Sequence, residues 1–486
     1  MHVMSTRRAL LFSFLDRYSG LVLSVASSMV IARLLTPAEL GTFSVSMALL
    51  LLGATVRDMG AGQYVVQTKE LTAAKIRAVW AIQLSIGAAL ALLVAALAVP
   101  AARFYHEPRM ALILWIMAVS YLVNPFGSIT YAVLMRDMRF QSVALMRIAA
   151  GLATAAVSIT LASRGHGAVS LAWGGLAGTL ANAAVAIAFR PPRMPWWPSL
   201  RGTREVLGFG GRIAGTSVIN TLVGSAPDFM LGKVQGLLAA GLYSRSNGLV
   251  GMFSRLVVDA VYNVALALFA QQRREGEAVG PGFLRAVAYV SVLNWGFMAG
   301  LALLAYPVTR LLYGGQWDAT VPLTRWLALA GALAAPVPIC IAACTAMGRA
   351  DLVLRTSVLT GVVTLLAVVA GASVNLVTMC MGLAGATLVN MLLWMLATRS
   401  VVPFQWHEVL GTARQSAAAA GLAALGPLAM VLWAGQAPTM SWPWAVAGSV
   451  AGAAGLLAGL WLTEHPLMSE LHRLWPKKPA ALESTS

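Results

Sequence analysis

Long apolar runs without a single charge dominate this chain and predict membrane-spanning helices. No charged residue occurs between Arg77 and Arg103, from Thr356 to Thr398, or from Gln415 to Thr463. Crossing the hydrocarbon core of a bilayer takes about 20 apolar residues in helical form. The last two runs are long enough for two spans each, with breaks at GASVN and GQAP. The pattern therefore predicts several helices that cross a membrane.

Applied to the whole chain, this pattern predicts an all-α integral membrane protein with about fourteen transmembrane helices. Helices are expected because lipid offers no partner for backbone N–H and C=O groups. We expect the spans at residues 12–32, 40–61, 78–99, 110–133, 142–162, 168–189, 206–227, 241–268, 285–306, 320–346, 354–372, 376–397, 415–434 and 442–462. No connection is long enough for a soluble domain. The N-terminal run lacks a small-residue cleavage site and is predicted to be an uncleaved first span.

Composition and charge agree with a membrane protein. Hydrophobic residues make up 59% of the 486 residues and charged residues 10%, and the mean hydropathy is +0.77. The net charge of +17 is unevenly distributed along the chain. With the N-terminus inside, 21 Lys and Arg fall on cytoplasmic segments and 6 on the opposite side. This bias predicts that both termini are cytoplasmic, and it explains the positive charge without nucleic-acid binding.

The chain offers little sign of a cofactor, a metal or an enzyme. The cysteines Cys340, Cys344 and Cys380 lie in apolar spans, with no His or carboxylate beside the first two. We expect them to be packed small residues. Motifs of phosphate loops, zinc hydrolases and serine hydrolases are absent. We expect no cofactor and no enzymatic activity.

Two segments about 200 residues apart repeat one pattern, RLLTPAELGTFSVS at residues 33–46 and KVQGLLAAGLYSRS at residues 233–246. Three further correspondences follow in the same order: PAAR with PVTR, a Trp ten residues before a Pro, and GLAG. Their offsets are 200, 207, 211 and 207 residues. Four matches in sequence order indicate an internal duplication.

The repeated unit holds six spans, and this even number makes the two copies parallel. We therefore expect two six-helix lobes, at residues 1–199 and 200–400. Residues 401–486 add two helices and a cytoplasmic tail. The last span carries glycines at helix-packing spacing, which is more typical of contacts within a bundle than of a dimer interface. Two parallel lobes around a central cavity are typical of transporters that work by alternating access.

Four segments resemble a known family: IARLLTPAELGTFSV, FYHEP, PDFMLGKVQGLLAAGLYS and LYGGQWDATVPLTRWLALAG. From Leu15 to Asn390, their order and spacing resemble the polysaccharide transporter family of the multidrug/oligosaccharidyl-lipid/polysaccharide exporter superfamily. The resemblance is greatest to Wzx-type flippases related to colanic acid exporters. The family's acidic residue after LTP is present as Glu39. Its acid–base pair in the seventh span is changed, because Asp228 is followed by Phe229.

The resemblance implies a flippase in the bacterial inner membrane. Family members move undecaprenyl-pyrophosphate-linked oligosaccharides from the inner to the outer leaflet, for surface polysaccharide synthesis. Spans 1, 2, 7 and 8 line the cavity in this superfamily. The implied partners are the lipid-linked substrate, membrane lipids, a polysaccharide polymerase and a chain-length regulator.

Ionisable residues inside the predicted spans are candidate binding residues, because a charge at mid-bilayer costs at least about 2.5–3.5 kcal/mol. They are Asp16, Arg17, Arg57, Asp58, Arg147, Arg212, Asp228, Arg245, Arg255, Asp259 and Arg325. Arginine binds phosphate oxygens through two parallel hydrogen bonds. We therefore predict a substrate site that contains Arg255, Arg57, Arg17, Arg212, Asp58, Asp259, Asp228 and Arg147. Arg255, nearest the bilayer centre, is the expected main ligand of the pyrophosphate.

Other interpretations of these charges remain open. Arg17, Arg57, Arg147 and Arg212 lie near span ends, where they could extend to the lipid headgroups. Arg255 and Asp259, four residues apart on one helix, could neutralise each other.

Two other functions also remain open. A cation-coupled multidrug exporter of the same superfamily would favour an acidic cavity, whereas seven bases and four acids lie in these spans. A membrane polymerase or glycosyltransferase would need a large catalytic loop, and the sequence has none.

The charge bias generates a topological prediction. We expect Lys233 and His106 on the outer face and both termini in the cytoplasm. Single-cysteine variants at these two positions should react with a membrane-impermeant reagent in intact cells. Protection of both positions would contradict the predicted orientation.

Overall fold

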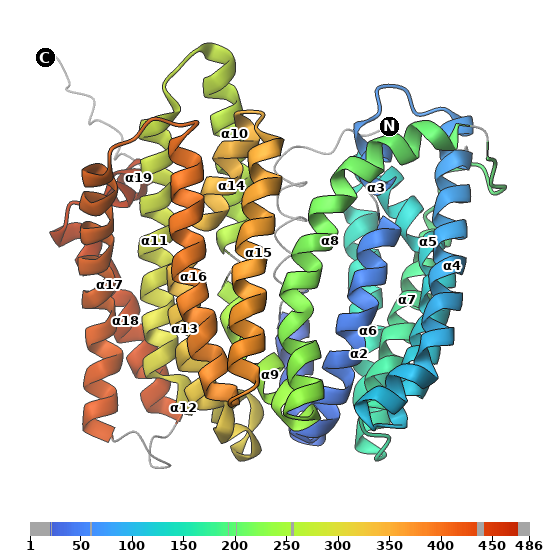
Figure 1. The fold of residues 1–486 in the computed structure, drawn as a ribbon, viewed down its shortest axis with the longest axis horizontal. Coiled ribbons are helices and arrows are strands. Elements are labelled where there is room, and N and C mark those ends of the chain that lie inside the picture. Colours follow the sequence, from blue (N-terminus) through green and yellow to red (C-terminus); the bar gives the residue numbers. More distant parts are fainter. Residues whose placement is uncertain are drawn as a thin grey trace, which may run out of the picture. The chain divides into compact units, whose positions relative to one another are not determined.

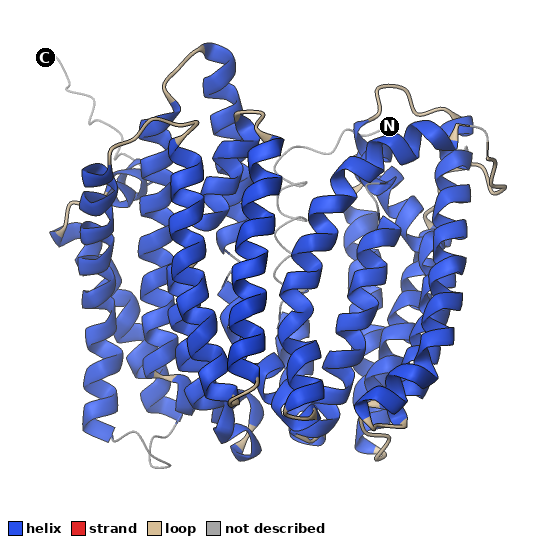
Figure 2. Ribbon diagram, in the orientation of Figure 1, coloured by secondary structure: helices blue, strands red, loops and turns tan. Residues whose placement is uncertain are grey.

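The computed structural model of the protein describes residues 20, 22–58, 61–192, 194–200, 202–253, 257–434 and 442–474. Within these residues every regular element is a helix (Figures 1 and 2). An unlabelled helix, Val22–Leu34, comes first. It is followed by α2 (Pro37–Asp58), α3 (Ala61–Gln67), α4 (Ala73–Tyr105), α5 (Arg109–Arg136), α6 (Phe140–Ser163), α7 (Val169–Ala188), α8 (Thr203–Val234) and α9 (Leu237–Phe253). The remaining elements are α10 (Asp259–Glu275), α11 (Val279–Leu303), α12 (Ala305–Tyr313), the 3-10 helix η2 (Gly315–Thr320), α13 (Val321–Leu333), α14 (Val337–Ala346), α15 (Ala350–Ala372), α16 (Leu376–Arg399), α17 (Trp406–Ala434), α18 (Trp442–Leu462) and α19 (Pro466–Leu474).

From residue 20 onward the helices follow the predicted spans. In the described part of the chain, eleven helices are long and apolar enough to cross a membrane. Helix α8 is 32 residues long but carries charges along its length, and α9 has only 17 residues. The prediction of an all-α integral membrane protein is confirmed.

Some predicted spans consist of two helices instead of one. The predicted span at 320–346 is divided into α13 and α14, with Pro336 immediately before α14. Proline has no N–H to donate to the preceding turn, and its ring clashes with the helix backbone. The corresponding Pro125 lies inside α5, which continues through it. Proline therefore ends a helix in one copy of the repeat and is accommodated in the other.

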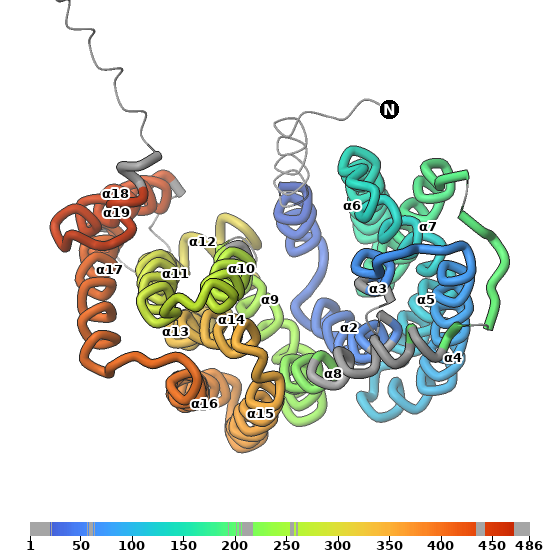
Figure 3. Tube along the Cα trace, turned by 90° about the horizontal axis from the view of Figure 1, so that it is seen from above, coloured from blue at the N-terminus to red at the C-terminus, as the bar shows by residue number. Residues whose placement is uncertain are grey.

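Contacts divide the chain into two compact units. Unit 1 holds residues 1–245, 312–319 and 368–379. Its central helix is α5, which packs against α4, α7, α3 and α2, while α6 packs against α7 and α2 against α8 (Figure 3). The core of unit 1 includes the fully buried Trp80 and Ile113.

Unit 2 contains residues 246–311, 320–367 and 380–486. Its central helix is α11, which packs against α17, α13 and α10, and α17 packs against α18. The predicted packing role of the α18 glycines is confirmed, because Gly455 meets the backbone of Leu422 and Gly459 meets that of Ala419. The predicted lobes, residues 1–199 and 200–400, were defined by the internal repeat. A division by contacts does not test them, so they stay a prediction.

The start of α2 meets the start of α9 at two glycines of the repeated motif. Gly41 and Gly241 are each the fifth residue of their helix. A Cβ atom on Gly41 would collide with the carbonyl oxygen of Leu237, and one on Gly241 with that of Pro37. The contact is reciprocal: each glycine faces the first residue of the other helix. The two copies of the motif therefore touch backbone to backbone inside unit 1.

This contact generates a stability prediction. Alanine at Gly41 should force the two helices apart and destabilise the protein by about 1–3 kcal/mol, the usual cost of overpacking. The matched control is Gly248→Ala, also in α9, where a Cβ meets no atom within 4 Å. The control should be neutral or slightly stabilising, because alanine favours helix over glycine. Thermal midpoints of the purified variants in one detergent check this, and equal stability of Gly41→Ala and wild type would refute the contact.

Candidate functional site

The structure describes the side chains of only some of the predicted binding residues. Arg17 and Arg255 lie outside the described residues. Asp58, Arg212 and Asp259 belong to α2, α8 and α10, and their side chains also lie outside the described part. Arg57, Arg147 and Asp228 are described, and all three belong to unit 1. The grouping of the eight residues into one pyrophosphate site stays a prediction.

Arg57, at the C-terminal end of α2, lies over an aromatic ring of α5. Its guanidinium carbon is 5.6 Å from the centroid of the Tyr121 ring. The Tyr121 hydroxyl donates a hydrogen bond to the carbonyl oxygen of Leu50 and thereby ties α5 to α2. The attraction between a cation and an aromatic face stabilises an arginine in this position without removing its charge. Arg57 is therefore held by protein groups, whatever its role in binding.

Asp228 joins α8 to α2 through a hydrogen bond. The Ser44 hydroxyl donates to its carboxylate at 2.7 Å. Ser44 belongs to the repeated motif and lies one turn after Gly41. This carboxylate thus has a hydroxyl partner, which gives Asp228 a structural role in the contact between α2 and α8.

Arg147 and the base Arg245 line one cavity in unit 1, with a volume of about 790 Å³. Its walls come from the helix Val22–Leu34 and from α2, α6, α7 and α9. The lining residues include Ser24, Ser27, Ser28 and Thr154, which carry hydroxyl groups, and the described lining contains no carboxylate. The three serines are spaced i, i+3 and i+4, so they share one face of their helix.

The packing of α6 positions one wall of this cavity. Arg147, Gly151 and Thr154 occupy one face of α6. A Cβ on Gly151 would lie 2.9 Å from a methyl carbon of Leu23, so α6 and the helix Val22–Leu34 approach closely there. At Thr154, further along the same face, α6 also meets α7, because Gly178 leaves room for the Thr154 side chain. Small residues thus bring these helices together, as is usual in membrane proteins.

Arg245 lies in this cavity although the predicted binding set omits it. The sequence places Arg245 among the charges inside the membrane, near the outer face. Its place in the cavity wall follows only from the packing of α9 near the helix Val22–Leu34 and α6. The predicted site also omits the serine face of the first span. Hydroxyls at i, i+3, i+4 spacing are the signal in the sequence that locates this wall.

A second cavity, of about 400 Å³, lies among α11, α17 and α18 of unit 2. Apart from Ser449, its described lining is apolar and includes Phe297 and Leu456. It has no charged lining residue among those described. Such a surface suits hydrocarbon and not a charged headgroup.

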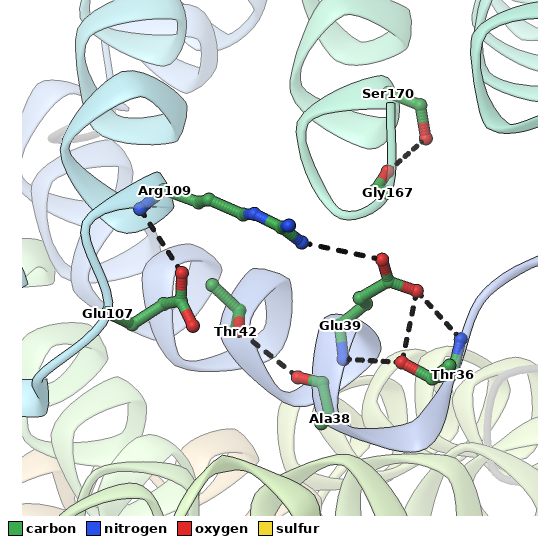
Figure 4. Close-up of polar contacts among 8 residues, drawn as sticks. All are labelled: Thr36, Ala38, Glu39, Thr42, Glu107, Arg109, Gly167 and Ser170. Atoms are coloured by element: carbon green, nitrogen blue, oxygen red, sulfur yellow. Dashed lines mark hydrogen bonds and ion pairs between the residues drawn. The ribbon is translucent and has the colours of Figure 1, made fainter. Parts of the chain in front are cut away.

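Glu39, the acidic residue after LTP, caps the start of α2 (Figure 4). Its carboxylate accepts from the Thr36 N–H at 2.9 Å and the Thr36 hydroxyl at 3.0 Å, and Thr36 Oγ1 accepts from the Glu39 N–H at 3.3 Å. The sequence TPAE therefore forms a capping box with proline at the first helical position. Arg109 lies 3.6 Å from the other carboxylate oxygen. Gly167 has φ of +56° and packs against this carboxylate, where a Cβ would clash.

The capping box predicts how Glu39 variants behave. Glu39→Ala should destabilise the protein by about 1 kcal/mol through loss of the cap, and Glu39→Gln less, because an amide oxygen still accepts from Thr36. Arg109→Gln should change stability little, because the Arg109 side chain is 62% exposed and exposed ion pairs contribute little. Thermal midpoints of the three variants measure this. If Arg109→Gln lowered the thermal midpoint more than Glu39→Ala, the ion pair with Arg109, and not the capping box, would be the main contribution of Glu39 to stability.

The apolar helices define the class of the protein: it is a multi-pass membrane protein. The structure is similar to that of lipid II flippase MurJ in an inward closed conformation, with a TM-score of 0.73, 14% identity and coverage of 94% of this chain and 100% of that one. It is also similar to an inward-facing multidrug resistance MATE family transporter of the MOP superfamily (TM-score 0.61, 15% identity, 81% and 98% covered).

Residues 30–322 match the sequence profile of a family described as polysaccharide biosynthesis protein, and the chain belongs to that family. Over 81% of its length it is 24% identical to the succinoglycan biosynthesis transport protein ExoT of Rhizobium meliloti, of which 78% is covered. It is 21% identical to the lipopolysaccharide biosynthesis protein WzxC of Escherichia coli, over 64% of each chain. The predicted resemblance to polysaccharide transporters is confirmed.

Proposed function

We propose that this protein is a flippase for lipid-linked saccharides, which moves undecaprenyl-pyrophosphate-linked repeat units across the bacterial inner membrane for surface polysaccharide synthesis. The observation that carries the proposal is the cavity of unit 1. Its described lining holds two arginines, four hydroxyl groups and no carboxylate. A positive, hydroxyl-lined cavity suits a substrate that combines phosphate with sugar.

The family and its relatives support the same substrate. The names of ExoT and WzxC refer to transport in succinoglycan biosynthesis and to lipopolysaccharide biosynthesis, and both products contain saccharide chains. A charged saccharide cannot cross the hydrocarbon core unaided, because the transfer of polar and charged groups into it is strongly unfavourable. A protein with transmembrane helices and a polar cavity provides the path. The polyprenyl chain can stay in lipid or in the apolar cavity among α11, α17 and α18.

The competing function is export of cationic drugs. The MATE transporters share the fold at 15% identity, which says nothing about cargo. A cationic drug would require negative charge in the cavity, whereas Arg147 and Arg245 make the described lining positive. Charge complementarity therefore favours an anionic substrate. We further infer that the protein acts as a transporter and not as an enzyme, that both termini are cytoplasmic, and that a polysaccharide polymerase and a chain-length regulator act with it.

Deletion of the gene in its own host tests the proposed function. We expect loss of surface polysaccharide and accumulation of single lipid-linked repeat units in the inner leaflet, both reversed by the wild-type gene. Drug sensitivity without a change in polysaccharide would instead indicate a multidrug exporter. Altered chain length without accumulated repeat units would indicate a polymerase.

The predicted role of Arg255 is tested in the same strain. Arg255→Ala should abolish export, and Arg255→Lys should reduce it partway, because lysine keeps the charge but loses the planar fork. Both variants should reach normal abundance, since removal of a buried charge does not oppose membrane insertion. Arg274→Ala, at an exposed position in the last turn of α10, is the matched control. Normal export by Arg255→Ala at normal abundance would show that Arg255 only neutralises Asp259.

A further inference from the structure

Arg136, the last residue of α5, binds the end of α3 through several backbone carbonyl groups. Its Nη1 donates to the carbonyl oxygens of Val65 at 2.8 Å, Thr68 at 2.6 Å and Val66 at 3.4 Å, and its Nη2 donates to that of Lys69 at 3.1 Å. Carbonyl groups at the end of a helix lack partners inside the helix, and an arginine can supply them. Because α3 also packs against α5, Arg136 fastens the end of α3 to α5 (Figure 3).

Arg273, in the last turn of α10, makes a similar contact in unit 2. Its Nη1 donates to the carbonyl oxygen of Ala346, the last residue of α14, at 3.0 Å. Gly348, two residues further, has φ of +72°, and a Cβ atom there would lie 2.8 Å from Nη1 of Arg273. Glycine therefore provides both the left-handed turn and the space through which Arg273 reaches the end of α14.

The predicted repeat relates the two contacts to each other. In the repeat, spans 2 and 4 correspond to spans 8 and 10. The first contact joins α3, which extends span 2, to α5, which is span 4. The second joins α10, which completes span 8, to α14, which completes span 10. The same pair of spans is thus tied in each copy, but the arginine comes from span 4 in the first copy and from span 8 in the second.

The sequence shows how this exchange of the donor is accommodated. Arg136 follows Pro125 by eleven residues, and Gly348 follows the corresponding Pro336 by twelve. At nearly the same place in the repeat, one copy therefore has the arginine and the other has the glycine that admits Arg273. Two different residue patterns that produce the same tie indicate that the tie itself is the common feature.

Both ties hold an element that follows a helix of the cavity in unit 1. Leu40 and Phe43 of α2 line this cavity, and α3 is the next helix in the chain. Arg245 of α9 also lines it, and α10 is the next α-helix. In the predicted topology, the ends of α3 and α10 face the cytoplasm, the side from which a substrate of the inner leaflet enters. The two ties therefore lie at the predicted entry side.

We propose that Arg136 and Arg273 are positioning residues for transport, which fasten the cytoplasmic ends of spans 2 and 8 to their own lobes so that each span moves with its lobe. The inference rests on the proposed function and goes beyond it, because it concerns motion and not the substrate. Rocking of one lobe against the other alternates access to a cavity when the spans around the cavity follow their lobes. Without its tie, the end of span 2 or 8 lags behind its lobe and the entry opens incompletely.

The chemistry of the tie predicts a graded series of variants. A guanidinium has five N–H donors in a planar fork, and Arg136 uses both terminal nitrogens on carbonyl groups. Lysine offers a single nitrogen with three donors, and glutamine a single amide nitrogen on a shorter side chain. Arg136→Lys should therefore keep part of the tie, and Arg136→Gln should lose most of it.

A distance within unit 1 tests the tie on purified protein, independently of transport. Spin labels are attached at the exposed residues Gln67, in α3, and Gln141, in α6, after replacement of the three buried cysteines by alanine. Dipolar EPR spectroscopy should give a distance distribution about twofold broader in Arg136→Gln than with Arg136 present, because the end of α3 is released. Arg139→Gln removes a neighbouring exposed base and is the matched control, with an unchanged distribution. Equal widths with and without Arg136 overturn the tie.

Export per molecule tests whether the tie serves transport. In the deletion strain, we expect Arg136→Gln to lower export about fivefold or more relative to protein abundance, and Arg136→Lys to lower it less. Arg139→Gln should export as wild type does. A residue that only stabilises the fold would lower abundance and leave export per molecule unchanged. Normal export per molecule by Arg136→Gln would therefore overturn the positioning role.

The tie in unit 2 gives a second test, which applies even if Arg136→Gln does not accumulate. We expect Arg273→Gln to lower export per molecule in the same way, whereas Arg274→Gln, at the next exposed residue of the same turn, should not. Equal export by these two variants would overturn the role of Arg273. If the wild-type gene itself does not restore polysaccharide, the proposed flippase function is wrong, and the EPR distances still decide whether the tie exists.

Discussion

The backbone contact between Gly41 and Gly241 is the constraint on which the rest of unit 1 depends. Because neither residue has a side chain, the starts of α2 and α9 approach until each glycine meets a carbonyl oxygen of the other helix. This close approach also positions the residues one turn further along each helix. On α2, Val45 packs beside Gly232, and on α9, Arg245 reaches Ser28 on the first span. A single contact thus supports both the apolar packing around Val45 and a charged wall of the cavity.

Small residues bring the helices of this bundle together at close contacts, beside buried large side chains such as Trp80 and Ile113. Lipid is as apolar as leucine, so burying leucine between helices gains little, and close packing depends on glycine, alanine and serine. Gly151 and Gly178 let α6 approach its two neighbours, and Gly455 and Gly459 do the same for α18 against α17. The hydroxyls that remain at such contacts either bond to backbone carbonyls or, as in the first span, line a cavity.

The contacts of each charged side chain separate two kinds of charge in the bundle. Some contribute to the contacts between helices, and Arg245 keeps its charge without an ion pair in the described part of the chain. Glu39 closes the capping box of α2, and Asp228 accepts from Ser44, so both carboxylates have structural partners. Arg57 rests on an aromatic ring. Arg245 differs because its counterpart in the repeat is valine, because its hydroxyl and aromatic contacts leave the charge in place and because it faces a cavity. The cost of keeping such a charge in a membrane is explained if a substrate anion completes its environment.

Hydropathy and residue order were enough to predict the class of the protein, the positions of most of its helices from residue 20 onward, and the repeated motif that forms the central contact. They suffice because a bilayer of nearly constant thickness requires a helix of nearly constant length. The pairing of each charge with its partners, in contrast, emerged only from the folded chain. The capping box of TPAE joins residues that are three apart in the chain, but the Arg245 environment joins Ser28, Tyr313 and Trp317. Residues that are far apart in the chain become neighbours only through helix packing, which hydropathy does not encode.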